Sequence, residues 1–133
     1  MKINNLFTGL LLFSLLFNSN LYGQSDVLNL NDNNYEEKTT QGIVVVEYWA
    51  NWNKVNLVTL LDTIEIKGIE IYRVNIDSSL GLQLKNSVIV VPTIIFYDDG
   101  KEYKRLQGDL SFTLDITKKD LQKIIDEILM SKF

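Results

Sequence analysis

The chain has 133 residues, enough for one domain, and its apolar and charged fractions of 46% and 23% are ordinary for a globular protein. It contains no cysteine and no histidine, which excludes thiol nucleophiles, disulfide bonds and imidazole catalysis, and also removes the usual ligands of transition metals. The formal charge of -4 argues against a nucleic-acid partner.

The amino terminus predicts an export signal. Lys2 precedes the uncharged run "LFTGLLLFSLLF" at 6–17, which is too short for an ordinary membrane helix, and small Gly23 follows as a cleavage position. We therefore expect residues 1–23 to be a signal peptide and residues 24–133 to form the mature domain, in the periplasm or secreted, without a stable membrane anchor. An uncleaved anchor is the alternative, because Leu21 is not the small residue expected two positions before the cut.

The first half of the mature chain predicts alternating strands and helices. "VLNL" at 27–30 is a short strand, and "NDNNYEEKTTQG" at 31–42 is a helix capped by Asn31 or Asp32 and ended by its final glycine. The β-branched and aromatic run "GIVVVEYWA" at 42–50 is typical of a strand buried on both faces.

A helix is predicted over 54–68, followed by a strand at 69–77 and a short helix at 78–88. The predicted buried side of the first of these helices consists of Val55, Val58, Leu61 and either Ile64 or Glu65. Lys67 and Gly68 supply its stop signal.

The last third predicts a hairpin and a helix. Residues 93–108 form two strands about an Asp-Asp-Gly turn, and "TKKDLQKIIDEILM" at 117–130 is an amphipathic helix that Thr117 and Asp120 begin as a capping box. Its predicted apolar face consists of Leu121, Ile124, Ile125, Ile128 and Leu129. The whole order predicts one α/β domain, in which a central mixed β-sheet has parallel strands, a final antiparallel hairpin and helices on both faces.

Four short motifs resemble the thioredoxin family. The stretch "VEYWANWNKVN" at 46–56 keeps Trp49, Ala50 and Trp52 of that family's segment before its Cys-Gly-Pro-Cys site. "YRVNID" at 72–77, "VIVVPTIIFYDDGKE" at 88–102 and the glycine at position 108 resemble later segments in the same order. The resemblance extends over roughly 27–131 and implies a thioredoxin-like fold.

The sequence departs from that family at its reactive positions. Asn53 and Asn56 stand where the two cysteines would be, with Lys54 and Val55 between them. An amide side chain does not ionise in the accessible range and has no redox couple. We therefore expect a redox-inactive chain without a catalytic residue, in which Asn53 caps the following helix.

Glu47 matches a buried acid of the family whose role there is proton transfer to the deeper cysteine. Without that cysteine, a buried carboxylate needs a cation or a proton. Arg73 lies in the neighbouring predicted strand, so we expect a buried Glu47–Arg73 ion pair. A lone general acid is the alternative, although no second catalytic group can be named beside it.

Pro92 is the only proline in the chain. The resemblance implies a cis Val91–Pro92 bond that faces the Asn53–Asn56 segment, and a groove in which Trp52, Val91 and Pro92 pair with an extended peptide. The alternative is that the proline and the tryptophans only maintain the fold.

Two functions follow from these observations. One is a redox-inactive domain that binds a protein or peptide partner, and the other, by fold analogy alone, is a thiol–disulfide oxidoreductase of cell redox homeostasis. A structural component of the cell envelope is a third possibility. No cofactor, metal site or phosphate-binding loop is predicted from the residue pattern.

Overall fold

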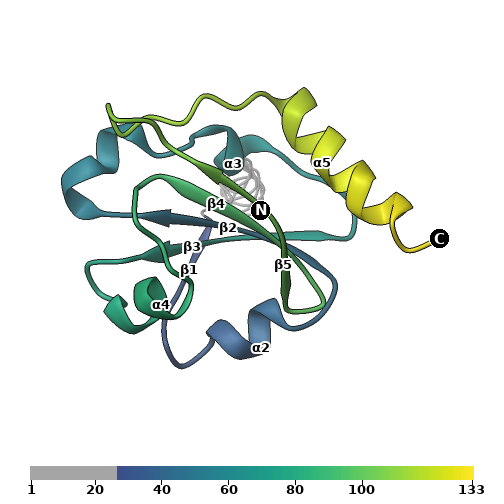
Figure 1. The fold of residues 1–133 in the computed structure, drawn as a ribbon, viewed down its shortest axis with the longest axis horizontal. Helices are drawn as coiled ribbons and strands as arrows, with labels where there is room; N and C mark the ends of the chain where they lie inside the picture. The colour runs from purple at the N-terminus through teal and green to yellow at the C-terminus, as the bar shows by residue number, and fades with distance from the viewer. Residues whose placement is uncertain (1–26) are drawn as a thin grey trace, which may run out of the picture.

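The computed structural model describes residues 27–133, which form a five-stranded sheet with helices on both faces (Figure 1). The strands are β1 (Leu28–Leu30), β2 (Ile43–Trp49), β3 (Ile69–Asn75), β4 (Thr93–Asp98) and β5 (Lys101–Gln107). Their order across the sheet is β1-β3-β2-β4-β5. β1 and β2 run parallel to β3, whereas β4 is antiparallel to both β2 and β5. The predicted mixed α/β sheet is confirmed. The predicted signal peptide at 1–23 lies outside the described residues.

The helical elements divide between the two faces of the sheet. They are α2 (Tyr35–Thr39), the 3-10 helix η2 (Asn51–Asn56), α3 (Leu60–Thr63), α4 (Leu80–Lys85) and α5 (Lys118–Met130). α2 and α4 cover one face, and α3 and α5 cover the other (Figure 1). Among residues 27–133, no helix has both the length and the apolar character needed to cross a bilayer.

Strand β2 is buried on both faces, as its sequence predicts. Val44, Val46 and Tyr48 belong to the core beneath α2 and α4, while Ile43 and Val45 belong to the core beneath α3 and α5. Successive residues of a strand point to opposite faces, so an uninterrupted apolar run is needed where helices cover both.

The hairpin and the last helix follow their sequence signals closely. Asp99 and Gly100, between β4 and β5, have φ angles of 48° and 82°, and positive φ at both central residues is what a tight hairpin turn requires. Thr117 and Asp120 form the predicted capping box at the start of α5. Leu129 is an exception, because it is 42% exposed rather than buried.

The predicted helix over 54–68 is wrong. The chain forms η2 and then the four-residue α3, with Leu57 in a non-helical conformation between them, and Val55 is 92% exposed. The backbone of Val58 explains the break, because its N–H donates to the Glu47 carboxylate and its carbonyl accepts from Arg73. The buried charges of the sheet therefore bind backbone groups next to the point where the predicted helix is interrupted.

The first two predicted helices outside this region are shorter than expected. The segment predicted at 31–42 is helical only in α2, and Asn31 accepts backbone hydrogen bonds from Asn33 and Asn34 in a turn before that helix. The predicted cap, Asn31 or Asp32, is wrong, because Asn34 is the residue that precedes the first turn of α2. The helix expected at 78–88 is limited to α4.

Three tyrosine hydroxyls meet inside the core beneath α2 and α4. The hydroxyl oxygens of Tyr48 and Tyr97 are 2.7 Å apart, and Tyr35 donates to Tyr97 at 2.9 Å. Tyr97 in turn donates to the Asn86 side-chain oxygen at 3.1 Å. Burial raises the pKa of the Tyr48 phenol far above its usual value, with smaller contributions from the two other tyrosines. The cluster satisfies hydroxyls that would otherwise be buried without partners.

Candidate functional site

The residues singled out from the sequence gather at the carboxyl ends of β2 and β3. η2 begins directly after β2 and lies at the left of Figure 1, beside the loop that leads into β4. The Val91–Pro92 peptide bond in that loop is cis, as the resemblance implies. The Pro92 carbonyl accepts from the Gly108 N–H at 2.8 Å, which joins the loop to the end of β5.

Asn53 is buried at 6% exposure and connects three segments of the chain. Its side-chain nitrogen donates to the Phe112 carbonyl at 3.0 Å and to the Val91 carbonyl at 3.3 Å. Its side-chain oxygen accepts from the Asn56 amide at 2.7 Å. The prediction that Asn53 caps a helix is therefore wrong: Ala50 is the residue before η2, and the Asn53 side chain bonds across the site instead.

The two asparagines are thus linked to each other, and the two residues between them face solvent. Lys54 is exposed and Val55 is 92% exposed. Amide hydrogen bonding of this kind positions backbone segments, and it supplies neither a nucleophile nor a redox couple.

Phe112 is a site residue that the sequence interpretation missed. Its ring packs edge-on against Trp52, with centroids 4.9 Å apart and planes at 90°. Trp52 is 60% exposed and Phe112 is 40% exposed. Phe112 follows β5 by five residues in a segment without regular structure, so only its proximity to the predicted family glycine, Gly108, signalled it.

The loop that carries Phe112 is held by Asp109. The Asp109 carboxylate accepts from the backbone N–H and the hydroxyl of Ser111, at 2.9 and 2.6 Å, and from the Thr113 N–H. These bonds, led by that of the Ser111 hydroxyl, lower the pKa of Asp109. Phe112 adopts a φ of 58°, which is uncommon for a bulky residue. The position of the ring is therefore fixed by its own loop and by Asn53.

Gly108 is a glycine because the chain is crowded there. An added Cβ would approach the Pro92 carbonyl oxygen at 3.1 Å and the Thr113 carbonyl oxygen at 3.2 Å. The close approach lets the end of β5 lie against the cis-proline loop, which brings the Asp109 loop over Asn53.

A small pocket opens beside the Trp52–Phe112 pair. Its volume is about 210 Å³, and its lining residues come from five separate stretches of the chain. They are Trp52, Ile76, Gln83, Ile89, Val90, Val91 and Phe112. Ile89 is 83% exposed, so the apolar surface continues outside the pocket. Trp49, by contrast, is half-buried and donates to the Asn29 side chain at 2.8 Å.

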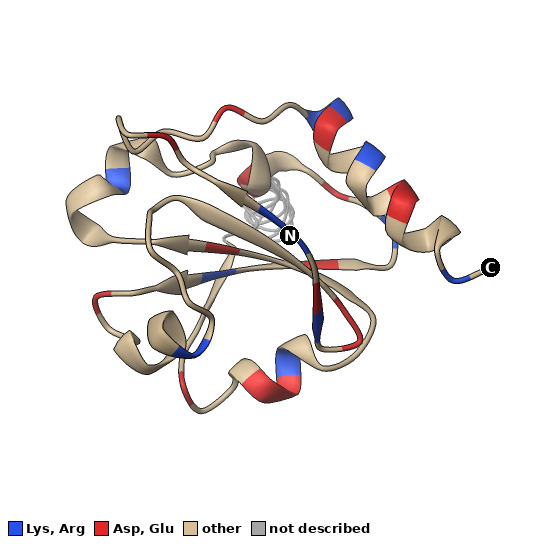
Figure 2. Cartoon of the chain, in the orientation of Figure 1, with Lys and Arg blue, Asp and Glu red and all other residues tan. Residues whose placement is uncertain are grey.

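The expected contact between Glu47 and Arg73 is present on the face of the sheet beneath α3. Figure 2 shows the acidic and basic positions side by side on β2 and β3. Arg73 Nε lies 2.8 Å from Glu47 Oε1, and Arg73 Nη1 lies 2.5 Å from Asp62 Oδ1. Burial raises the pKa of Glu47, and the Val58 hydrogen bond and Arg73 offset this only in part. For Arg73, burial lowers the pKa, but the hydrogen bonds to Asp62 and Glu47 outweigh it.

This arrangement gives Glu47 a structural role. Its side chain is fully buried and bonded to Arg73 and to the Val58 backbone, so it is not exposed on the surface of the described residues. Within residues 27–133 there is also no cluster of acidic side chains that could hold a metal ion.

Comparisons with known proteins agree with this geometry. The family model described as Thioredoxin matches residues 26–127. The thioredoxin of Chlamydia trachomatis is 32% identical over 79 residues, which are 56% of this chain and 78% of that protein. The thioredoxin of Staphylococcus haemolyticus is 22% identical over 108 residues, 77% of this chain and 98% of that protein. A variant thioredoxin from Halobacterium salinarum superposes with a TM-score of 0.63 at 18% identity, over 77% of this chain and 89% of that chain.

Proposed function

Because this chain belongs to the thioredoxin family and has no cysteine, we propose that it is a redox-inactive member that binds a protein or peptide partner. Thiol–disulfide exchange needs one thiolate to attack a disulfide and a second thiol to release the mixed disulfide. Asn53 and Asn56 stand at those two positions and bond to each other. The domain therefore has the backbone fold of the family around this site but lacks the two thiols that carry out the exchange.

The observation that supports binding is the Trp52–Phe112 pair held beside a pocket. Large aromatic side chains are the residues on which protein interfaces depend most. Here one of them is exposed on η2, and the other is fixed against it by a loop that Asp109 and Asn53 hold in place. An arrangement that is already ordered loses little conformational entropy when a partner binds.

The hydrogen bonds at the site suggest how such a partner binds. The family resemblance implies strand pairing with the backbone beside the cis-proline, but the Val91 carbonyl already accepts from Asn53 and the Pro92 carbonyl accepts from Gly108. Main-chain pairing is therefore limited, and an apolar side chain of the partner, inserted between Trp52 and Ile89, contributes most of the affinity.

We also propose that the domain works after export, in the periplasm or outside the cell. This rests on the amino-terminal sequence pattern of residues 1–23 alone. Amino-terminal sequencing of the chain recovered from the exported fraction tests it: a mature end at Gln24 is expected, and recovery of the intact chain from the cytoplasm would refute it.

Partner capture tests the binding role. The mature chain is immobilised and exposed to the exported fraction, alongside Trp52→Ala, Phe112→Ala and the control Tyr103→Ala, which removes an exposed aromatic residue from β5. We expect a specific partner to be retained by the wild type and the control and lost by both site variants. Equal retention by all four proteins would show that the partner binds to another surface of the domain.

A thiol-exchange assay tests redox inactivity. The purified chain is supplied with a disulfide substrate and dithiothreitol, and we expect the rate of the uncatalysed reaction. Turnover above that rate would refute the proposal and favour the oxidoreductase alternative.

A further inference from the structure

Strand β5 forms one edge of the sheet, on the side opposite to β1. In an antiparallel pair, residues that bond to the neighbouring strand alternate with residues whose main-chain groups point away from it. The Gly108 N–H donates to the Pro92 carbonyl at 2.8 Å, so in the register of β4 and β5 the next bonded residue is Leu106. The N–H and carbonyl groups of Arg105 and Gln107 therefore point outward from the sheet.

These outward groups are free within the described domain. Among residues 27–133, no other strand pairs with the outer side of β5, and no main-chain group bonds to the outward atoms of Arg105 or Gln107. The segment after β5 returns on the α5 side of the sheet, where Leu114 and Ile116 pack against the core (Figure 1). An edge with free main-chain groups is a template for an added strand.

The start of the mature chain enters the sheet at the other edge. β1 begins at Leu28 and is separated from β5 by β3, β2 and β4, which makes four strand spacings, or about 19 Å. In the mature chain proposed above, only residues 24–26 precede Val27. Three residues span at most about 11 Å, so they do not reach β5 and the edge is open to another chain.

The side chains of β5 give this edge a positive charge. Arg105 binds Glu102 at 2.6 Å, whereas Lys101 and Lys104 are exposed and form no ion pair in the described part of the chain. Lysines on an edge disfavour pairing with a second copy of the same strand, because that copy brings further cations. An acidic strand is attracted by the same charges.

A groove lies on the α5 side of β5. Its volume is about 280 Å³, and its apolar lining consists of Leu106, Leu114, Ile116 and Ile124. Lys104 lines the same groove and lies two residues before Leu106, so both side chains point to one face of the strand. Lys123 and three acidic residues complete the lining, so the charges of the groove itself are mixed and Lys104 sets the preference at the strand.

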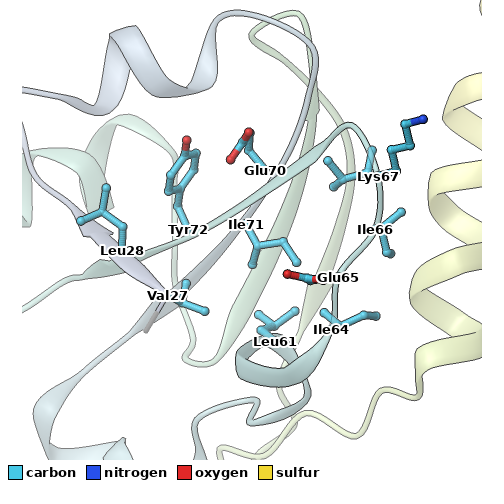
Figure 3. Close-up of a pocket in the computed structure, with 11 residues that line it drawn as sticks. Val27, Leu28, Leu61, Ile64, Glu65, Ile66, Lys67, Glu70, Ile71 and Tyr72 are labelled. Carbon is cyan, nitrogen blue, oxygen red and sulfur yellow. The ribbon is translucent and has the colours of Figure 1, made fainter. Parts of the chain in front are cut away.

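The trough between the end of α3 and β3 (Figure 3) does not offer a comparable edge, although its volume is about 680 Å³. The Ile69 N–H there donates to the Ile66 carbonyl, and Glu70 is hydrogen-bonded to Tyr72. Main-chain and charged groups at that trough thus have partners within the domain, whereas those on the outer side of β5 do not.

We infer that the outer edge of β5 binds, as an added antiparallel strand, an extended segment of a partner protein in which an acidic residue follows an apolar residue by two positions. In this register the apolar side chain lies opposite Leu106 at the groove, and the acidic side chain lies opposite Lys104. The main chain of the partner bonds to Arg105 and Gln107. The edge includes neither Trp52 nor Phe112, so it is a second surface beyond the proposed function.

Synthetic peptides test the inference. The probe is acetyl-Thr-Thr-Val-Thr-Glu-Thr-Thr-amide, and its matched controls carry Lys in place of Glu, or Pro in place of the central Thr. In nuclear magnetic resonance titrations of the chain that begins at Gln24, the probe is expected to shift the amide signals of Arg105 and Gln107. The Lys and Pro peptides are each expected to bind at least about fivefold more weakly, a change of roughly 1 kcal/mol.

Hydrogen exchange tests the geometry of the edge. In the free chain, we expect the amides of Arg105 and Gln107 to exchange rapidly and that of Leu106, which bonds to β4, to exchange slowly. The probe should slow exchange at Arg105 and Gln107 only. Slow exchange at both positions in the free monomer would show that the edge is already covered, and this would overturn the inference.

Charge reversal supplies a further arm. In Lys104→Glu, we expect the preference between the Glu and Lys peptides to reverse. The control Lys67→Glu makes the same change of charge in the exposed loop before β3 and should keep the wild-type preference. Trp52→Ala is expected to leave peptide binding unchanged, which separates this surface from the proposed function.

Three other results would contradict the inference. The first is the absence of shifts at Arg105 and Gln107 at millimolar probe, and the second is equal binding of the Glu and Lys peptides. The third is dimerisation that protects Arg105 and Gln107 as the protein concentration rises, because it would assign the edge to a second copy.

Discussion

Replacing Arg73 by methionine would remove the cation from the buried ion pair between β2 and β3. Arg73 donates to Glu47 at 2.8 Å, to Asp62 at 2.5 and 3.3 Å, and to the Val58 carbonyl at 3.0 Å. Glu47 is fully buried and would keep only the Val58 N–H among these partners. Methionine has a similar length and leaves no large void, so the change tests the charge and its hydrogen bonds.

The expected loss of unfolding free energy is about 3 kcal/mol near pH 8, at the lower end of the range for removing one partner of a buried pair. The lower end applies because the Asp62 side chain is 39% exposed and can be solvated, and because Glu47 can take up a proton. Since a domain of this size has a total stability of roughly 5–15 kcal/mol, the variant should still fold.

The loss should depend on pH. Burial holds the folded-state pKa of Glu47 above its usual value, so its favourable contribution is fully present below the unfolded-state pKa and is lost as the pH rises through the folded-state pKa. Arg73 lowers that pKa in the wild type, so removing it raises the pKa further. The variant is therefore expected to be less destabilised near pH 5 than near pH 8.

Urea unfolding followed by tryptophan fluorescence measures these differences. Lys104→Met is the matched control, because it removes an exposed cation on β5, and we expect it to change stability by less than about 0.5 kcal/mol. Adding Glu47→Gln to the Arg73 variant should recover stability near pH 8 and abolish the pH dependence. A loss below about 1 kcal/mol, as for an exposed pair, or an equal loss at both pH values, would refute the reasoning.

Three further predictions concern the site and the core. Asn53→Asp replaces the amide that donates to Val91 and Phe112 by a carboxylate that cannot donate, so urea unfolding at neutral pH should show a loss of about 2–3 kcal/mol. The double variant with cysteine at Asn53 and Asn56 places two thiols where the side chains now meet, and it should gain disulfide reduction that neither single variant shows. Tyr48→Phe should lower stability by about 1–2 kcal/mol without changing partner capture. Since burial raises the pKa of Tyr48, the wild type should lose stability as the pH rises above about 10, and the phenolate absorbance that it shows in excess of Tyr48→Phe should appear only with unfolding.

Lys54→Ala is the control for the Asn53 variants, because Lys54 is an exposed neighbour on η2. Wild-type stability in Asn53→Asp would contradict the role given to the amide. Absence of turnover in the double cysteine variant would show that the domain lacks other features needed for disulfide reduction besides the two cysteines. An excess of phenolate absorbance in the wild type over Tyr48→Phe before unfolding would contradict the enclosed tyrosine cluster.

The buried strand, the hairpin turn and the start of the last helix could be predicted because their sequence signals are local. The unbroken apolar run of β2, the Asp-Gly turn and the Thr117 capping box each lie within a few residues of the structure that they specify. Propensity and periodicity describe such short-range effects well.

The site could be predicted only in part, because its decisive contacts join distant segments. Asn53 bonds to Phe112, 59 positions away, and the helix expected after it is interrupted where Glu47 and Arg73 take the backbone groups of Val58. Sequence periodicity placed Val55 on a buried helical side, but it carries no information about a carboxylate on another strand. The Glu47–Arg73 contact could be predicted because the two residues lie on neighbouring predicted strands and a buried carboxylate needs a cation as its partner.

The amide link between Asn53 and Asn56 also determines how the surface responds to its surroundings. A cysteine pair forms a disulfide bond or is reduced according to the redox potential of the medium, so the geometry of such a site depends on that potential. A hydrogen bond between two carboxamides at 2.7 Å has no such dependence. The Trp52–Phe112 pocket should consequently present one geometry to its ligand in an oxidising and in a reducing medium alike, as a constant receptor rather than a sensor.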